Sequence, residues 1–243
     1  MPARRGTAGP SSSRWAKAPF HDDLDQEKGL KGIPLAKEGL VFVLPPLTLS
    51  LLFLGFNFYI LSLLFFLVFL FFLYFFRHPR RTFQGPEDAI ISPADGRVMG
   101  IDEVEEADFV EGRALRVSIF MGLADVHVNR APCDGVVSRV VHRPGHFEPA
   151  YRKDCDTRNE RNYVLLDRDG ERLLVVQIAG ILARRIHCWV REQDAVKRGE
   201  PIGMIAFGSR VDIYLPQDCE SMVQLNQRVK SGLTPLARKR GNA

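Results

Sequence analysis

The sequence has few cysteines, and none of them is placed to form a recognisable site. No two of the four form a CxxC pair. Neither the ligand spacing of a zinc site nor the dense pattern of a secreted disulfide scaffold is present. We therefore expect no metal and a reducing compartment. The four are Cys133, Cys155, Cys188 and Cys219.

Concentrated charge of one sign is also lacking. The 33 Lys and Arg residues are scattered among 29 Asp and Glu residues, which leaves a net charge of +4. A nucleic-acid-binding protein gathers its basic residues on one face or segment. We therefore expect no nucleic acid partner and interpret the excess of positive charge as membrane-related.

Residues 39–76 contain no charged residue. A single membrane crossing needs about 20 apolar residues, so one helix does not account for this block. Gly55 and Asn57 interrupt it near its middle, which predicts a two-helix membrane anchor with helices at about 40–54 and 58–76. Two consecutive prolines in the short first helix make a re-entrant hairpin an alternative, and a buried helix pair in a soluble core is a third arrangement.

Basic residues flank the apolar block on both sides, which by the positive-inside tendency predicts that both of its ends face the cytoplasm. Residues 1–38 mix Ser, Pro, Gly and charges without apolar periodicity, and we predict a disordered cytoplasmic tail. The expected location is the inner cell membrane, with the remaining chain on its cytoplasmic face. The flanking residues are Arg14, Lys17, Lys28, Lys31 and Lys37 before the block and Arg77, Arg80 and Arg81 after it.

Beyond the apolar block the pattern changes to short runs rich in β-branched residues, separated by Gly, Pro and Asp. No long amphipathic helix is evident. We predict a mainly β domain over residues 77–216, built as a folded-over sheet or sandwich, and a C-terminal tail over 217–243. The clearest runs are 115–120, 135–141, 163–167 and 173–178.

Three segments place a reactive side chain beside turn-forming residues: 92–96 (SPADG), 125–132 (DVHVNRAP) and 207–212 (FGSRVD). Each one alone is ambiguous, because Asp in a turn, a structural His and a Gly-Ser loop are all common. Taken in order, they resemble the phosphatidylserine decarboxylase family in its short form. The resemblance covers residues 75–216 and includes FFRHPRR, SPADGRV, IFMGLADVHVNRAPCDG, PGHF, NERN and FGSRVDIYLP.

The resemblance implies a proenzyme that cleaves itself between Gly208 and Ser209. The Ser209 hydroxyl would attack the Gly208 carbonyl, and the resulting ester would undergo β-elimination and lose ammonia. Ser209 would thereby become a pyruvoyl group at the start of the small fragment, which stays associated with the large one. Glycine suits the acyl side because it tolerates a strained turn and close approach.

The same resemblance implies the substrate and the chemistry of the mature enzyme. The pyruvoyl ketone would form a Schiff base with the amine of phosphatidylserine, with no PLP and no metal. Loss of carbon dioxide and hydrolysis would then release phosphatidylethanolamine for phospholipid biosynthesis. The oligomeric state stays open, a homo-oligomer included.

A serine hydroxyl needs a neighbouring base, which is usually oriented by a third group. The family pattern assigns a processing role to the Asp of PADG, here Asp95, and His127 is our candidate base. An imidazole near its ordinary pKa would also return a proton after decarboxylation. Longer relatives carry a second histidine three positions after the first, where this chain has Arg130. Either His127 serves both steps or another histidine supplies the base: His142, His146 or His187.

Several other basic residues are candidates to hold the lipid phosphate or carboxylate, although solvated surface charge is the simpler interpretation of each. The segment 142–147 (HRPGHF) similarly fits either a direct role or a turn with two satisfied histidines. The four arginines considered are Arg130, Arg139, Arg143 and Arg210.

Two other functions fit part of the sequence. A membrane-tethered serine peptidase would use Ser209, His127 and Asp95 on other proteins, but FGSRVD lacks the GxSxG spacing. A carrier or scaffold domain is suggested by the turn-rich spacing of residues 192–205, which is similar to lipoyl and biotinyl carriers. That segment lacks a modifiable Lys in a hairpin, which makes carrier function the weaker interpretation.

Overall fold

A computed structural model describes residues 34–106, 108–150, 155–181, 185–206 and 208–240. Most of the predicted tail over 1–38 therefore lies outside the described residues. The described chain begins with a 3-10 turn, η1 (Lys37–Gly39), followed by two helices, α2 (Leu40–Gly55) and α3 (Tyr59–Phe75). These helices match the two predicted from the apolar block to within one residue at each end.

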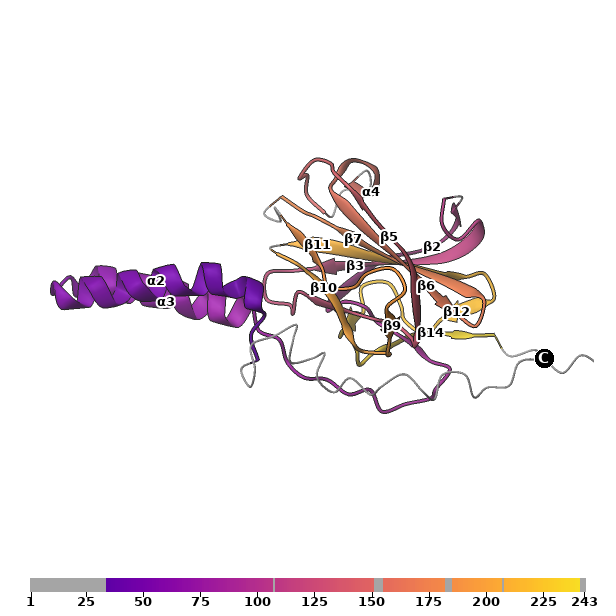
Figure 1. Cartoon of the computed structure of the whole chain (residues 1–243), viewed down its shortest axis with the longest axis horizontal. Helices are drawn as coiled ribbons and strands as arrows, with labels where there is room; N and C mark the ends of the chain where they lie inside the picture. The colour runs from indigo at the N-terminus through magenta and orange to yellow at the C-terminus, as the bar shows by residue number, and fades with distance from the viewer. Residues whose placement is uncertain (1–33, 107, 151–154, 182–184, 207, 241–243) are drawn as a thin grey trace, which may run out of the picture.

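Helices α2 and α3 form an antiparallel hairpin that projects from the rest of the molecule (Figure 1). Asn57 takes the left-handed conformation in the turn between them, with φ 64°, which asparagine tolerates better than most residues. Ser50 and Ser62 face each other, and each hydroxyl donates to the other's backbone carbonyl, at 3.0 and 2.9 Å. These bonds satisfy both hydroxyls inside an apolar pair of helices.

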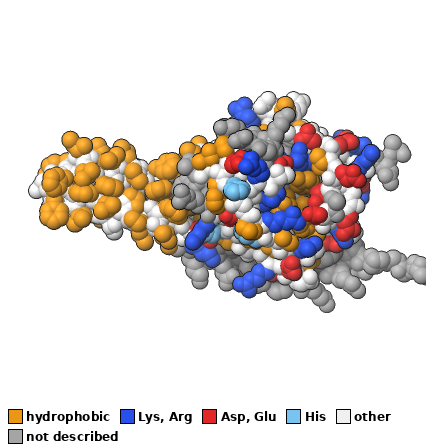
Figure 2. Space-filling model, turned by 90° about the horizontal axis from the view of Figure 1, so that it is seen from above, with side chains coloured by type: hydrophobic (Ala, Val, Ile, Leu, Met, Phe, Trp, Pro, Cys, Tyr) orange, Lys and Arg blue, Asp and Glu red, His pale blue; other side chains and the backbone are white. Residues whose placement is uncertain are grey.

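The hairpin surface is almost entirely hydrophobic, whereas charged side chains cover the β domain (Figure 2). Val41 and Ile60 are 76% and 88% exposed. The segment Lys37–Gly55 is long and apolar enough to cross a membrane, and Tyr59–Phe75 is apolar but shorter. An exposed apolar surface of this extent indicates a covering partner or a lipid environment.

The remaining chain is mainly β, as predicted. A curled sheet of eight antiparallel strands has the order β13-β2-β3-β11-β7-β6-β5-β9, and two three-stranded sheets, β4-β10-β8 and β1-β14-β12, complete the domain. The four predicted runs lie in β3, β5, β6 and β7. The bounds are β1 Ile90–Ile91, β2 Gly96–Glu106, β3 Gly112–Met121, β4 Val128–Arg130, β5 Gly135–Arg143, α4 Cys155–Arg158, β6 Arg161–Arg168, β7 Glu171–Ile178, β8 Ile186–Cys188, β9 Ala195–Val196, β10 Pro201–Ile205, β11 Ser209–Pro216, β12 Cys219–Ser221, β13 Arg228–Val229 and β14 Pro235–Lys239.

Strand β11 lies in the middle of the large sheet, paired with β3 on one side and β7 on the other. Val211, Ile213 and Leu215 are fully buried and belong to the main hydrophobic core. Because side chains alternate along a strand, Ser209 shares their face and points toward the core. The strand therefore begins with a polar residue held in an apolar interior.

Residues 217–240 are part of the folded domain, although the sequence analysis places them in a C-terminal tail. They form β12, β13 and β14, and Leu236 and Ala237 on β14 are fully buried. These strands contain only two to five residues each, which is too short for an alternating pattern to be recognised.

Candidate active site

The Gly208–Ser209 peptide bond lies at the start of β11. Gly208 has φ +63°, a left-handed conformation that favours glycine. Its carbonyl oxygen occupies the space beside Gly180, since a Cβ built on Gly180 would lie only 2.0 Å from it. The two backbones therefore meet with no side chain between them, and glycine at position 180 allows this approach.

The Ser209 hydroxyl is fully buried and donates to the Met121 sulfur at 3.4 Å. Met121 is the partner of Ser209 across the β3–β11 pair. A thioether sulfur is a weak acceptor, so this bond holds the hydroxyl in place without activating it.

A chain of buried amide side chains leads to the same sulfur. Asn162 Nδ2 donates to Gln177 Oε1 at 2.9 Å, and Gln177 Nε2 donates to Asn129 Oδ1 at 2.8 Å. Asn129 Nδ2 then donates to Met121 Sδ at 3.7 Å. The direction of each bond fixes the orientation of the next amide, so Asn129 presents an N–H group to the Met121 sulfur, which also accepts the Ser209 hydroxyl.

His127 lies just before β4, and its imidazole is fully buried. Nδ1 is 2.9 Å from the Asp125 carbonyl oxygen, which can only accept, so Nδ1 carries the proton. Nε2 is therefore a bare acceptor, and it has no hydrogen-bond partner among the described residues. Burial lowers the pKa of His127 to about 4, so the imidazole is neutral at pH 7.

This lowered pKa corrects one expectation. The uncleaved chain does not hold an imidazole near its ordinary pKa, ready to donate at neutral pH. The neutral, unpartnered Nε2 instead has the properties of a general base.

The alternation of side chains along β4 explains why Arg130 does not replace the missing histidine. Asn129 points to the side of Ser209, because its amide contacts the sulfur that binds the Ser209 hydroxyl. Arg130 points to the other side, where it donates to the carbonyl oxygens of Gly199 and Pro79 at 2.7 and 2.8 Å. Arg130 thus connects loops beneath the site.

Asp95 is held by an ion pair with Arg81, in which Nη2 lies 2.9 Å from Oδ2. Its Oδ1 also accepts the backbone N–H of Ser231 at 2.7 Å. His127 uses Nδ1 for Asp125, so Asp95 does not orient the imidazole by a direct hydrogen bond to that nitrogen. It is close enough for its charge to raise the pKa of His127 slightly, against the larger effect of burial.

The remaining sequence candidates have other surroundings. His142 is half exposed and 3.8 Å from Glu160, and His146 is exposed. His187 on β8 is half-buried, and burial lowers its pKa. Among the arginines, Arg139 lies over the Phe109 ring, Arg143 binds Asp108, and Arg210 is buried against Asp212 on the opposite face of β11 from Ser209.

Sequence reasoning missed four residues that surround Ser209: Met121, Asn129, Gln177 and Gly180. Gln177 and Asn162 did carry a signal, because each is an uncharged polar residue inside an otherwise apolar strand run. Such a residue in a buried strand must find a polar partner. The remaining positions have no distinguishing local pattern.

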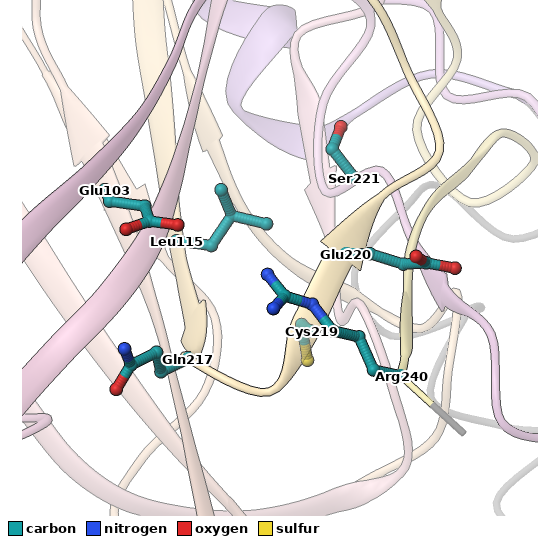
Figure 3. Close-up of a pocket in the computed structure, with 7 residues that line it drawn as sticks. All are labelled: Glu103, Leu115, Gln217, Cys219, Glu220, Ser221 and Arg240. Carbon is teal, nitrogen blue, oxygen red and sulfur yellow. The ribbon is translucent and has the colours of Figure 1, made fainter. Parts of the chain in front are cut away.

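A cavity of about 120 Å³ lies elsewhere in the domain (Figure 3). Leu115 lines it, and Met121 is six residues further along the same strand, so the cavity is roughly 20 Å from Ser209. Among the described residues, no group of three or more His, Cys, Asp or Glu side chains is placed to hold a metal ion.

Comparison with known proteins agrees with these motifs. The family model described as phosphatidylserine decarboxylase matches residues 68–237. A phosphatidylserine decarboxylase proenzyme of Carboxydothermus hydrogenoformans is 46% identical over 84% of this chain and 96% of its own length. Proteins with the same name from Desulfotalea psychrophila and Symbiobacterium thermophilum are 41% and 43% identical, each over 84% of this chain and 96% and 95% of their own lengths. The chain belongs to the phosphatidylserine decarboxylase family.

Proposed function

We propose that this chain is a self-processing, pyruvoyl-dependent decarboxylase that converts phosphatidylserine to phosphatidylethanolamine and carbon dioxide. One observation carries the proposal. A buried serine follows a left-handed glycine, and a neutral histidine with a bare Nε2 lies two residues before Asn129, whose amide contacts the sulfur that binds Ser209. Family membership supports the reaction and the substrate.

Self-cleavage begins when Ser209 Oγ leaves the Met121 sulfur and attacks the Gly208 carbonyl carbon. His127 Nε2 takes the hydroxyl proton, and the Asp95 carboxylate favours the imidazolium that forms. The acyl group moves from nitrogen to oxygen, which converts the peptide bond into an ester. Removal of the Ser209 α-proton then expels the Gly208 carboxylate, and hydrolysis of the resulting enamine releases ammonia.

The site fits a pyruvoyl group because that group forms from Ser209 itself, inside a pocket that already excludes water. When present, it supplies the carbonyl that withdraws electrons as carbon dioxide leaves. The chain's own contributions are a buried environment, the Asn129 amide that contacts the sulfur beside Ser209, and the bare Nε2 of His127, which would move a proton at the reacting carbon.

The hairpin is proposed to hold the enzyme in the inner membrane, with the β domain on the cytoplasmic face. Helices of 16 and 17 residues are about 24 and 26 Å long, slightly less than the roughly 30 Å hydrocarbon core. The turn between α2 and α3 carries no charge, so the hairpin can enter the bilayer from one side without moving a charge into lipid. The substrate would then reach the site from the bilayer in which it resides.

The proposed function is tested with Ser209→Ala, which removes both the nucleophile and the precursor of the cofactor. On a denaturing gel, the unmodified chain should give two fragments, and the smaller should carry a carbonyl that borohydride reduces. Ser209→Ala should remain full-length and should release no carbon dioxide from phosphatidylserine. The matched control, Ser138→Ala on β5, should be processed normally.

Each alternative function predicts a different result. A serine peptidase would lose activity on other proteins in Ser209→Ala but would carry no carbonyl on any fragment. A scaffold would run as one intact chain before any substitution. Normal cleavage of Ser209→Ala would refute the proposal directly.

A further inference from the structure

The membrane hairpin ends against the candidate base. Phe75, the last residue of α3, is fully buried, and its ring lies 4.2 Å from the His127 imidazole, centroid to centroid, at an angle of 33°. No other aromatic ring among the described residues is recorded against this imidazole. The aromatic cover of His127 is thus supplied by the hairpin.

Two polar contacts join the same helix end to the loop that carries His127. The Arg77 guanidinium donates to the Ala124 carbonyl oxygen at 2.7 Å, and the Tyr74 hydroxyl donates to that oxygen at 3.2 Å. Contacts from residues 74, 75 and 77, which span about one helical turn, therefore hold the loop between β3 and β4. A flexible tether would have no need of such contacts.

The base of the hairpin is also packed firmly into the domain. Ala36 N–H donates to the Phe76 carbonyl oxygen at 2.9 Å, so the two ends of the hairpin are tied together. Trp189 Nε1 donates to Glu38 at 2.8 Å, which ties that base to the β domain. One buried cluster spans both parts: Leu35, Ala36, Val43, Phe75, Phe76 and Met204.

We propose that the last turn of the hairpin forms a wall of the active site, with Phe75 as a positioning residue that keeps water away from His127. The membrane segment is then part of the catalytic apparatus as well as an anchor. This inference rests on the proposed role of His127 as the base.

The charges around His127 set the direction of the expected effect. Burial lowers its pKa to about 4, and Arg77, at the end of α3, lowers it further; Asp125 in its own loop and Asp95 before β2 act in the opposite direction. Burial is the largest of these influences. Removing the Phe75 ring admits water, so the pKa of His127 should rise toward its ordinary value of 6.5.

The consequence for catalysis follows from the charge state. A protonated imidazole cannot accept the Ser209 proton, so a higher pKa removes the active base over a wider acidic range. The acid limb of self-cleavage should therefore shift to higher pH, while the rate well above pH 7 should change much less.

The test uses the full chain in lipid nanodiscs with Phe75→Ala, the more conservative Phe75→Leu, and Phe66→Ala as a control. Phe66 lies on the same helix but is 42% exposed and distant from its buried end. The acid limb of cleavage should shift upward by ~1–2 pH units in Phe75→Ala and by less in Phe75→Leu. Phe66→Ala should match the unmodified chain.

A second measurement separates this inference from the proposed function. The imidazole of His127 is titrated by NMR in Ser209→Ala chains, where no cleavage is needed. If the pKa of His127 is equal in the Phe75 and Phe66 variants, Phe75 does not keep water away from His127 and the inference is overturned. A His127 pKa near 6.5 in the chain with Phe75 unchanged would overturn it as well. If the wall is confirmed but Ser209→Ala still cleaves, only the proposed function fails.

Discussion

Adding a single methyl group at Gly180 tests whether the geometry of the scissile bond controls self-cleavage. The Cβ of Gly180→Ala would lie 2.0 Å from the Gly208 carbonyl oxygen and 3.0 Å from its carbonyl carbon. These are backbone atoms of the bond that is to be cleaved. They cannot turn aside as a flexible side chain would.

The size of the effect follows from the displacement that the methyl group requires. Ordinary contact begins near 3.4 Å, so one of the two backbones must move by roughly 1 Å or more. A misplacement of about 1 Å costs about 100-fold in a reaction that depends on alignment. We expect Gly180→Ala to cleave at least about 100 times more slowly than the unmodified chain.

The assay is the fraction of uncleaved chain against time on a denaturing gel. Gly112→Ala on β3 is the matched control, because nothing lies within 4 Å of the Cβ that it adds. Melting temperatures of both variants in the Ser209→Ala background show whether slow cleavage reflects misalignment or loss of fold. Cleavage of a well-folded Gly180→Ala at the normal rate would refute the reasoning.

Three further predictions concern the surroundings of the site. Asp95→Asn should slow cleavage and also lower the melting temperature. The substitution leaves the guanidinium of Arg81, whose side chain is 10% exposed, facing a neutral amide. An unchanged melting temperature would contradict the buried ion pair. The contribution of His127 to the stability of the uncleaved chain should be constant above pH 6.5 and should fall between pH 6.5 and about 4, by at most about 1.4 kcal/mol per pH unit, because His127 takes up a proton in that range only when unfolded. His127→Gln should abolish this contribution in chemical denaturation. Gln177→Leu should lower the free energy of unfolding by about 1–3 kcal/mol for each buried asparagine that loses its partner, and it should slow cleavage. A variant as stable as the unmodified chain would show that the chain of amide side chains is unimportant.

Much of the fold was readable from the sequence because its strongest patterns are local. The uncharged block at 39–76 predicted two helices, since apolar length and an interrupting Gly and Asn are properties of neighbouring residues. The β-branched runs predicted strands for the same reason. The strands of residues 217–240 escaped prediction because they are short and are stabilised by distant partners such as β1 and β2.

The candidate site was readable only in part. Gly208, Ser209, His127 and Asp95 were identified by short motifs and by a family resemblance that places them in order along the chain. Their roles remain proposals, and the tertiary structure changes how two of them would act. Asp95 is bound to Arg81, and its influence on His127 is electrostatic. The imidazole is neutral because it is buried, which no motif can express.

The amino-acid sequence alone thus specifies an apolar hairpin, a mainly β domain and a set of reactive residues, because composition and spacing decide local conformation and chemical type. The tertiary structure decides which of those residues meet. Only chain packing brings Gly180 against Gly208, links the amides of Gln177 and Asn129 to the sulfur that binds Ser209, and places Phe75 over His127. Such contacts join residues tens of positions apart, and they depend on strand register and side-chain alternation in the completed sheets. The environment that gives each reactive group its protonation state therefore exists only in the folded chain.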